Sequence, residues 1–110
     1  MNALSNVNFK QGIVDYNTFD IDFSKPMHEQ IWELNEDLVQ VIYLHGTDTH
    51  VLDVGWYPGS ESDGNAGFKI FVIKNQRWET PIFSKSARNE SDFFSVLNEA
   101  IEIASVSASA

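Results

Sequence analysis

The chain has 110 residues, 43% of them hydrophobic and 13% aromatic, and its 16 acidic and 7 basic residues give a net charge of −9. This length predicts a single domain, residues 1–110, and the composition is typical of a folded globular chain rather than a disordered one. The sequence contains no cysteine, which excludes disulfides and thiolate chemistry. Neither a signal peptide nor an apolar run of membrane-spanning length is recognisable, so we expect a cytoplasmic protein with no membrane partner.

The first part of the chain predicts an irregular lead-in followed by a short strand. Residues 1–12 are polar and without periodicity, and we expect a mobile lead-in, with flexibility over residues 1–18 and again over 105–110. Residues 19–23 read FDIDF. This alternation of apolar and acidic residues has the period of a half-buried edge strand.

Four further runs predict the strands of an antiparallel meander. In the second run Leu52, Val54 and Trp56 share one face, while Asp53 and Tyr57 share the other, because side chains alternate along a strand. The last run contains a proline, which cannot donate to a ladder and therefore predicts an edge strand or a bulge. The four runs are residues 38–45, 50–57, 68–74 and 79–86.

Two segments have the spacing of amphipathic helices. Residues 24–35 offer Ser24 as N-cap, a proline in the first turn and apolar residues at helical spacing. The second helix follows Asn89 as N-cap, and its apolar stripe comprises Phe93, Leu97, Ala100, Ile101 and Ala104. The order of elements predicts an α+β fold, an antiparallel meander of four to five strands with both helices packed on it. We expect five aromatic side chains to dominate the core, namely Trp56, Phe68, Phe71, Phe93 and Phe94.

The charge is unevenly distributed along the chain. Residues 26–67 contain eight acids and no Lys or Arg, whereas residues 68–88 contain five bases and one acid. Nucleic-acid binding requires clustered Lys and Arg, so this balance argues against a nucleic-acid partner. An acidic surface instead suits a basic protein partner, although ion pairs across the sheet or a solvated face explain such a pattern equally well.

Residues His45, Asp48 and His50 form the one cluster with metal-ligand chemistry, in the sequence HGTDTH. Two imidazoles and a carboxylate across a hairpin could hold a divalent metal ion, and a small metal-dependent enzyme or binder is the alternative function that this cluster suggests. The spacing matches no dedicated zinc pattern, and a hairpin turn of ordinary polar residues accounts for it as well. We therefore expect no metal and no other cofactor.

The loop PGSESDGNAG at residues 58–67 offers oxygen ligands but matches no ion-binding or phosphate-binding motif. It lacks the alternating acids and terminal Glu of an EF-hand, and its glycines do not open onto a helix. We interpret it as a long hairpin connection. No nucleophile motif such as GxSxG is present either, so we expect no enzymatic activity and no catalytic residues.

Several of these segments together resemble small bacterial immunity proteins encoded beside polymorphic toxins, including those of contact-dependent growth inhibition systems. The resemblance covers residues 19–104 and comprises DVGWYP at 53–58, a Gly/Asp loop, GFKIFVIK at 67–74, RWETPIF at 77–83 and the final capped helix. Its specific part is the pairing of VGWYP with a later W-x-x-P, here Trp78 and Pro81. It implies a non-enzymatic cytoplasmic protein that binds and neutralises a toxin domain, often a nuclease.

An acidic inhibitor would be steered to a toxin whose active-site cleft is basic, as nuclease clefts tend to be. We place the toxin-binding surface within the base-free segment, residues 26–67. Tyr57 is the aromatic candidate, because tyrosine is enriched among the residues that contribute most to interfaces. The expected partner-binding residues are Asp48, Asp53, Tyr57, Glu61 and Asp63.

Overall fold

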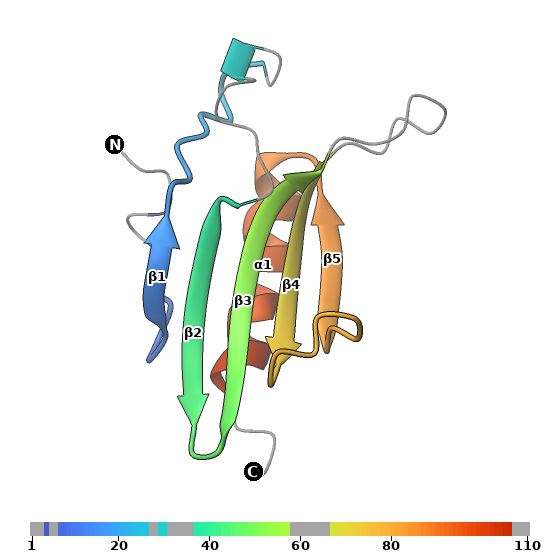
Figure 1. Cartoon of the computed structure of the whole chain (residues 1–110). Helices are drawn as coiled ribbons and strands as arrows, with labels where there is room; N and C mark the ends of the chain where they lie inside the picture. The colour runs from blue at the N-terminus through green and yellow to red at the C-terminus, as the bar shows by residue number, and fades with distance from the viewer. Residues whose placement is uncertain (1–3, 5–6, 27–28, 31–36, 58–66, 107–110) are drawn as a thin grey trace.

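The computed structural model describes residues 4, 7–26, 29–30, 37–57 and 67–106. Within these residues, five strands form one antiparallel sheet in chain order, and a single long helix follows the last strand (Figure 1). The predicted α+β meander is therefore confirmed. The elements are β1 (Ile13–Asn17), β2 (Val39–His45), β3 (Asp48–Tyr57), β4 (Gly67–Lys74), β5 (Phe83–Ala87) and α1 (Glu90–Ser105).

The first of the two predicted helices is not confirmed. Of residues 24–35, the structure describes a turn around Ser24 and a short 3₁₀ turn at Glu29–Gln30, where the Glu29 N–H donates to the carbonyl of Pro26. The remaining residues of that prediction, 27–28 and 31–35, lie outside the described residues.

The first strand lies at Ile13–Asn17, not at residues 19–23 as predicted. The burial pattern of FDIDF is nevertheless as expected, because Phe19 and Ile21 are buried while Asp20 and Asp22 are exposed. The backbone pairs with no strand there. Instead the Asp22 carboxylate accepts hydrogen bonds from the N–H and hydroxyl of Ser24, at 2.9 and 2.6 Å, and turns the chain. Alternating burial indicates which side chains enter the core, but it does not require a strand partner.

The boundaries of the later strands shift at their turns. The β2–β3 hairpin closes over two residues, with Gly46 in the left-handed region at φ 64°, so β3 begins at Asp48 instead of residue 50. The last strand begins at Phe83, not at residue 79, because the chain from Asn75 onward forms a broad turn before Pro81. The Ile82 N–H then donates to the carbonyl of Val72 and starts the pairing of β5 with β4.

The helix α1 packs on one face of β3, β4 and β5 (Figure 1). Its N-cap is as predicted, since the Asn89 side chain accepts a hydrogen bond from the Asp92 N–H at 2.8 Å. The predicted stripe is also confirmed, because the buried residues of the helix are Phe93, Leu97, Ala100, Ile101 and Ala104.

The N-terminal segment covers the same face of the sheet beside α1. Leu4 and Phe9 are buried in the core, and Gly12 lies so close to the Tyr43 ring that a Cβ there would approach ring atoms to 2.6 Å. Lys10 forms an ion pair with Glu102 near the end of the helix. The described part of the predicted lead-in thus contributes side chains to the core.

The core therefore lies between the sheet and a layer formed by α1 and the N-terminal segment. Its largest feature is an aromatic cluster in which the ring centroids of Phe19 and Phe68 lie 5.0 and 5.2 Å from that of Phe93. Trp56 and Phe94 pack at the margin of this core. The prediction that Phe71 belongs to the core is wrong, because strand alternation places it opposite Asp53, on the face away from α1.

Candidate functional site on the open face of the sheet

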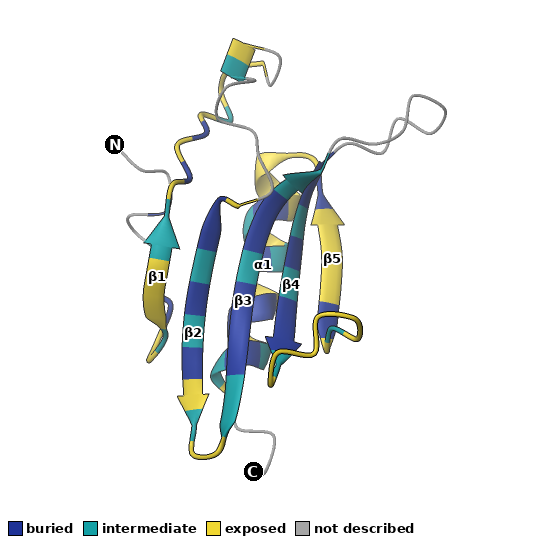
Figure 2. Cartoon of the chain, in the orientation of Figure 1, coloured by how far each residue is buried: buried dark blue, intermediate teal, exposed yellow. Residues whose placement is uncertain are grey.

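The face of the sheet opposite α1 carries a belt of apolar side chains with one acid among them. The pairing register places Val51 beside Ile73, and Asp53 beside Phe71, across β3 and β4. Ile73 and Val51 are buried, and Asp53 and Phe71 are half-buried. Figure 2 shows that β3 and β4 consist of buried and intermediate residues, whereas β1 and β5 carry exposed ones. The connection between β4 and β5 contributes Trp78 to this face. We call this surface the open face.

A hollow of about 190 Å³ lies on the open face. Tyr57 and Phe71 form one wall, with ring centroids 6.0 Å apart and planes nearly perpendicular at 88°. Trp78, which is 49% exposed, is brought to the hollow by the β4–β5 connection. The hollow is lined by Asp53, Tyr57, Phe71, Ile73 and Trp78.

Of the described residues that line this hollow, Asp53 is the only charged one. Its Oδ1 atom is buried and has no hydrogen-bond partner among the described residues. Burial raises the pKa of Asp53 to about 6, and the negative charge of Asp37 adds to this shift. A carboxylate that is desolvated without a compensating partner costs free energy. The ionised form of Asp53 therefore destabilises the folded chain.

Two further ionisable residues, Tyr16 and Lys69, interact with the residues of the hollow. Burial, together with the charges of Asp53 and Asp37, raises the pKa of Tyr16 on β1. The Nζ atom of Lys69 lies 5.3 Å from the centroid of the Tyr57 ring, a cation–π contact. The ring of Tyr57 thus already accepts one cation on the open face.

The structure brings together two of the five predicted partner-binding residues. Asp53 and Tyr57 both line the hollow. Asp48 is on the same strand but has the opposite parity, so it lies on the helix side, where it accepts a hydrogen bond from Asn75 Nδ2 at 3.0 Å and lies 3.9 Å from Lys74 Nζ. Glu61 and Asp63 lie outside the described residues.

Sequence reasoning missed three of the residues that line the hollow, namely Phe71, Ile73 and Trp78. The first two could have been found from the register, because they lie across the strand pair from Asp53 and Val51. The exposure of Trp78 depends on the path of the β4–β5 connection, for which the sequence offers no periodic signal.

The cluster of His45, Asp48 and His50 does not form a metal centre. His45 Nε2 and His50 Nδ1 both donate to the carbonyl oxygen of Ala104, at 2.7 and 2.9 Å, and so satisfy the last turn of α1. The hydrogen bond from Asn75 lowers the pKa of Asp48. Within the described part of the chain, no three His, Asp or Glu side chains are placed to hold a metal ion. The alternative function therefore gains no support from this geometry.

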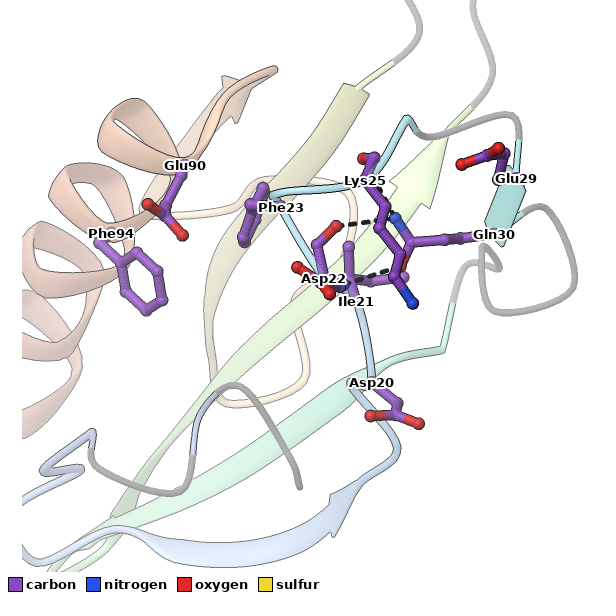
Figure 3. Close-up of a pocket in the computed structure, with 9 residues that line it drawn as sticks. All are labelled: Asp20, Ile21, Asp22, Phe23, Lys25, Glu29, Gln30, Glu90 and Phe94. Atoms are coloured by element: carbon purple, nitrogen blue, oxygen red, sulfur yellow. Dashed lines mark hydrogen bonds between the residues drawn. The ribbon is translucent and has the colours of Figure 1, made fainter.

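A larger hollow of about 700 Å³ lies between residues 20–25 and 29–30 on one side and the start of α1 on the other (Figure 3). The Asp22 N–H donates to Gln30 Oε1 at 2.7 Å, and Gln30 Nε2 donates back to the carbonyl of Asp22 at 2.8 Å. Figure 3 shows its acidic side chains spread around the hollow rather than converging on one point. We call it the acidic hollow; its charged residues are Asp20, Asp22, Lys25, Glu29 and Glu90.

Comparisons with protein-family models, with curated proteins and with solved structures found no match for this chain. None of the helices in the described residues is long and apolar enough to cross a membrane.

Proposed function

We propose that the chain is an immunity protein, which binds a cognate toxin domain through the open face of its sheet and neutralises it. The observation that carries this proposal is the difference between the two faces of the sheet. Among the described residues, α1 and the N-terminal segment cover one face. The other face presents aromatic side chains around Asp53, whose Oδ1 atom has no hydrogen-bond partner there. A surface of this composition suits protein binding better than catalysis, since Asp53 is the one carboxylate among the described residues that line its hollow.

The apolar content of the open face supports a protein partner. Leu44 on β2 is 61% exposed, and Ile13 on β1 is 55% exposed. These two strands continue the sheet beyond β3, next to the two strands that carry the hollow. Contiguous apolar surface on a monomer commonly marks an interaction site. Tyr57 and Trp78 belong to the residue types that dominate interface energetics when a partner buries them.

The charge supports a basic partner, and the resemblance to immunity proteins supports a toxin. With a net charge of −9 the chain attracts cationic surfaces over distances longer than a contact. A nuclease toxin has such a surface in the cleft that binds its polyanionic substrate. In this proposal the complex forms in the cytoplasm, where an incoming toxin would act.

The direct test is to purify the chain with the toxin domain encoded by the adjacent gene. We expect the two to co-elute and the toxin's activity to be inhibited. Tyr57→Ala and Trp78→Ala should each weaken the complex about tenfold or more, the usual effect of truncating a central aromatic anchor.

The matched control for this test is Asp48→Asn, which removes an acid from the same strand but from the helix side. It should leave the affinity within about twofold of the wild-type value, because polar groups outside an interface contribute little to binding. Absence of a complex, or wild-type affinity in both aromatic variants, would show that the open face does not bind a toxin. Loss of affinity confined to Asp20→Lys and Glu90→Lys would place the interface at the acidic hollow instead.

A further inference from the structure

The hollow on the open face combines two features that recognise an organic cation. A carboxylate, Asp53, has an oxygen that is buried and unpaired, and the aromatic rings of Tyr57, Phe71 and Trp78 line the same space. Aromatic faces attract cations through the ring quadrupole, and a desolvated carboxylate gains most from a partner of opposite charge. The remaining lining residue, Ile73, adds an apolar contact for a hydrocarbon stem.

We propose that this hollow is a receptor for one arginine side chain of the partner protein, with the guanidinium group bound by Asp53 and stacked against the aromatic walls. The inference rests on the proposed function only in that the arginine belongs to the bound partner. The chemistry of the hollow can be tested without that partner.

The size of the hollow fits a single side chain. Its volume of about 190 Å³ corresponds to about six water molecules at the density of the liquid. That is room for an extended side chain with its charged head, and it is too little for a folded element such as a helix turn with its neighbours.

Arginine fits the lining better than lysine does. The guanidinium group is planar, stacks on aromatic rings and binds a carboxylate through two parallel hydrogen bonds, and it is more weakly hydrated than an ammonium group. The ammonium group of lysine is compact and strongly hydrated, so it would lose more hydration free energy on entering a hollow lined by three aromatic rings. The chain's own Lys69 contacts the Tyr57 ring but does not line the hollow.

Binding should depend on pH through Asp53. The groups around this carboxylate are Asp37 and Tyr16, which interact with it electrostatically, and Tyr57 and Lys69 on the open face. Because the pKa of Asp53 is about 6, its carboxyl group in the unliganded protein is largely ionised at neutral pH and largely protonated at pH 5. A bound cation favours the ionised form, so arginine should lower the pKa of Asp53 and bind more weakly at pH 5 than at pH 7.

The experiment is an NMR titration of the intact chain with N-acetyl-arginine amide at pH 7, followed through backbone amides and the carboxyl carbon of Asp53. The neutral probe is N-acetyl-citrulline amide, which has the same shape without the charge. We expect shifts centred on Asp53, Phe71 and Trp78 with the arginine probe, and binding at least tenfold weaker with citrulline. The estimate reflects the loss of a charge-assisted hydrogen bond, which contributes about a factor of ten or more.

Variants distinguish binding of the arginine probe in the hollow from its non-specific attraction to an acidic protein. Asp53→Asn keeps the shape and should weaken arginine binding about tenfold, whereas Asp48→Asn removes the same charge from the helix side and should leave it unchanged. Trp78→Ala, on an exposed side chain, should also weaken binding while preserving the fold, as judged by the dispersion of the amide spectrum.

Several results would overturn the inference. These are equal binding of citrulline, equal loss in Asp53→Asn and Asp48→Asn, or no shift in the pKa of Asp53 on saturation. Equal or tighter binding of N-acetyl-lysine amide would overturn the choice of arginine. A chain that binds the arginine probe but no adjacent toxin would refute the proposed function and leave the receptor intact, so the two failures are distinguishable.

Discussion

Asp53 affects stability and binding in opposite directions, because its ionised form destabilises the free chain but would bind a cationic partner. Its raised pKa means that the folded chain binds a proton more tightly than the unfolded chain does. The resulting stabilisation is complete at low pH, where the carboxyl group is protonated in both states, and is lost as the pH rises through about 6. A residue that weakens the free protein at neutral pH is explained if a bound partner supplies the missing charge.

We therefore expect Asp53→Asn to stabilise the isolated chain at pH 7. The gain should be about 1 kcal/mol, less than the raised pKa alone implies, because solvent screens a half-buried carboxylate. Urea unfolding at several values between pH 4 and pH 7 measures it: the difference between variant and wild type should grow with pH. Asp20→Asn, on an exposed acid, is the control, and a pH-independent difference for Asp53→Asn would contradict the assignment.

Tyr43 carries a second unpaired polar group, on the helix side of β2. The side chain is fully buried, its hydroxyl has no hydrogen-bond partner in the part of the chain that the structure describes, and burial raises its pKa to about 12. Tyr43→Phe removes the hydroxyl and keeps the ring, so the free energy of unfolding should stay level or rise by about 1 kcal/mol. Tyr43→Leu, which also removes packing volume, should lower it by about 2 kcal/mol. Destabilisation by Tyr43→Phe would reveal a partner for the hydroxyl.

At the scale of elements, the β2–β3 hairpin caps the end of α1. The helix has no basic residue in its last turn. Gln11 Nε2 donates to the carbonyl oxygen of Ser105, and His45 and His50 both donate to the carbonyl oxygen of Ala104. The same two residues that suggest a metal site in the sequence thus connect a hairpin to a helix. Their chemistry is used for hydrogen bonding to the backbone.

The double variant His45→Ala/His50→Ala should lower the free energy of unfolding by about 2–4 kcal/mol, since it leaves a buried carbonyl unpaired and a void at His50. Amide hydrogen exchange should accelerate in the last turn of α1 more than in its first turn. Asn89→Ala removes the cap at the other end, and should cost about 1 kcal/mol and accelerate the first turn instead. Uniform acceleration in both variants would mean that the caps do not act locally.

At the scale of the whole molecule, net charge should control the rate at which the partner binds. A chain of −9 attracts a basic partner before contact, and salt screens this attraction. We expect the association rate constant for the toxin domain to fall about tenfold between low salt and 0.5 M NaCl, while the dissociation rate changes less. Stopped-flow fluorescence measures both. A rate that is independent of salt would show that the acidic surface takes no part in recognition.

The elements with a strong local signal were predicted correctly from the sequence. The helix at the end of the chain combines a capping side chain with a buried stripe, and Asn89 and Leu97 occupy the predicted roles. The faces of β3 also follow from period-two alternation, which places Trp56 and Tyr57 on opposite sides. Local signals of this kind need no knowledge of the partner strand.

The candidate site was predicted in part. Asp53 and Tyr57 share a face because of alternation along one strand, and that face is the open one. Asp48 was grouped with them through its charge, although its parity sends it to the helix side. Phe71 was assigned to the core, because aromatic character alone does not reveal which face of a sheet a helix covers.

By itself, the sequence determined which side chains of β3 share a face, the position and buried stripe of the last helix, and the excess of negative charge. These depend on local geometry and composition, which any fold of the chain would share. The tertiary structure alone decided that α1 and the N-terminal segment cover the same face. That choice places Asp53 on the face away from α1, beside Phe71 and Trp78, because residues from three separate segments meet only once the strands pair in register.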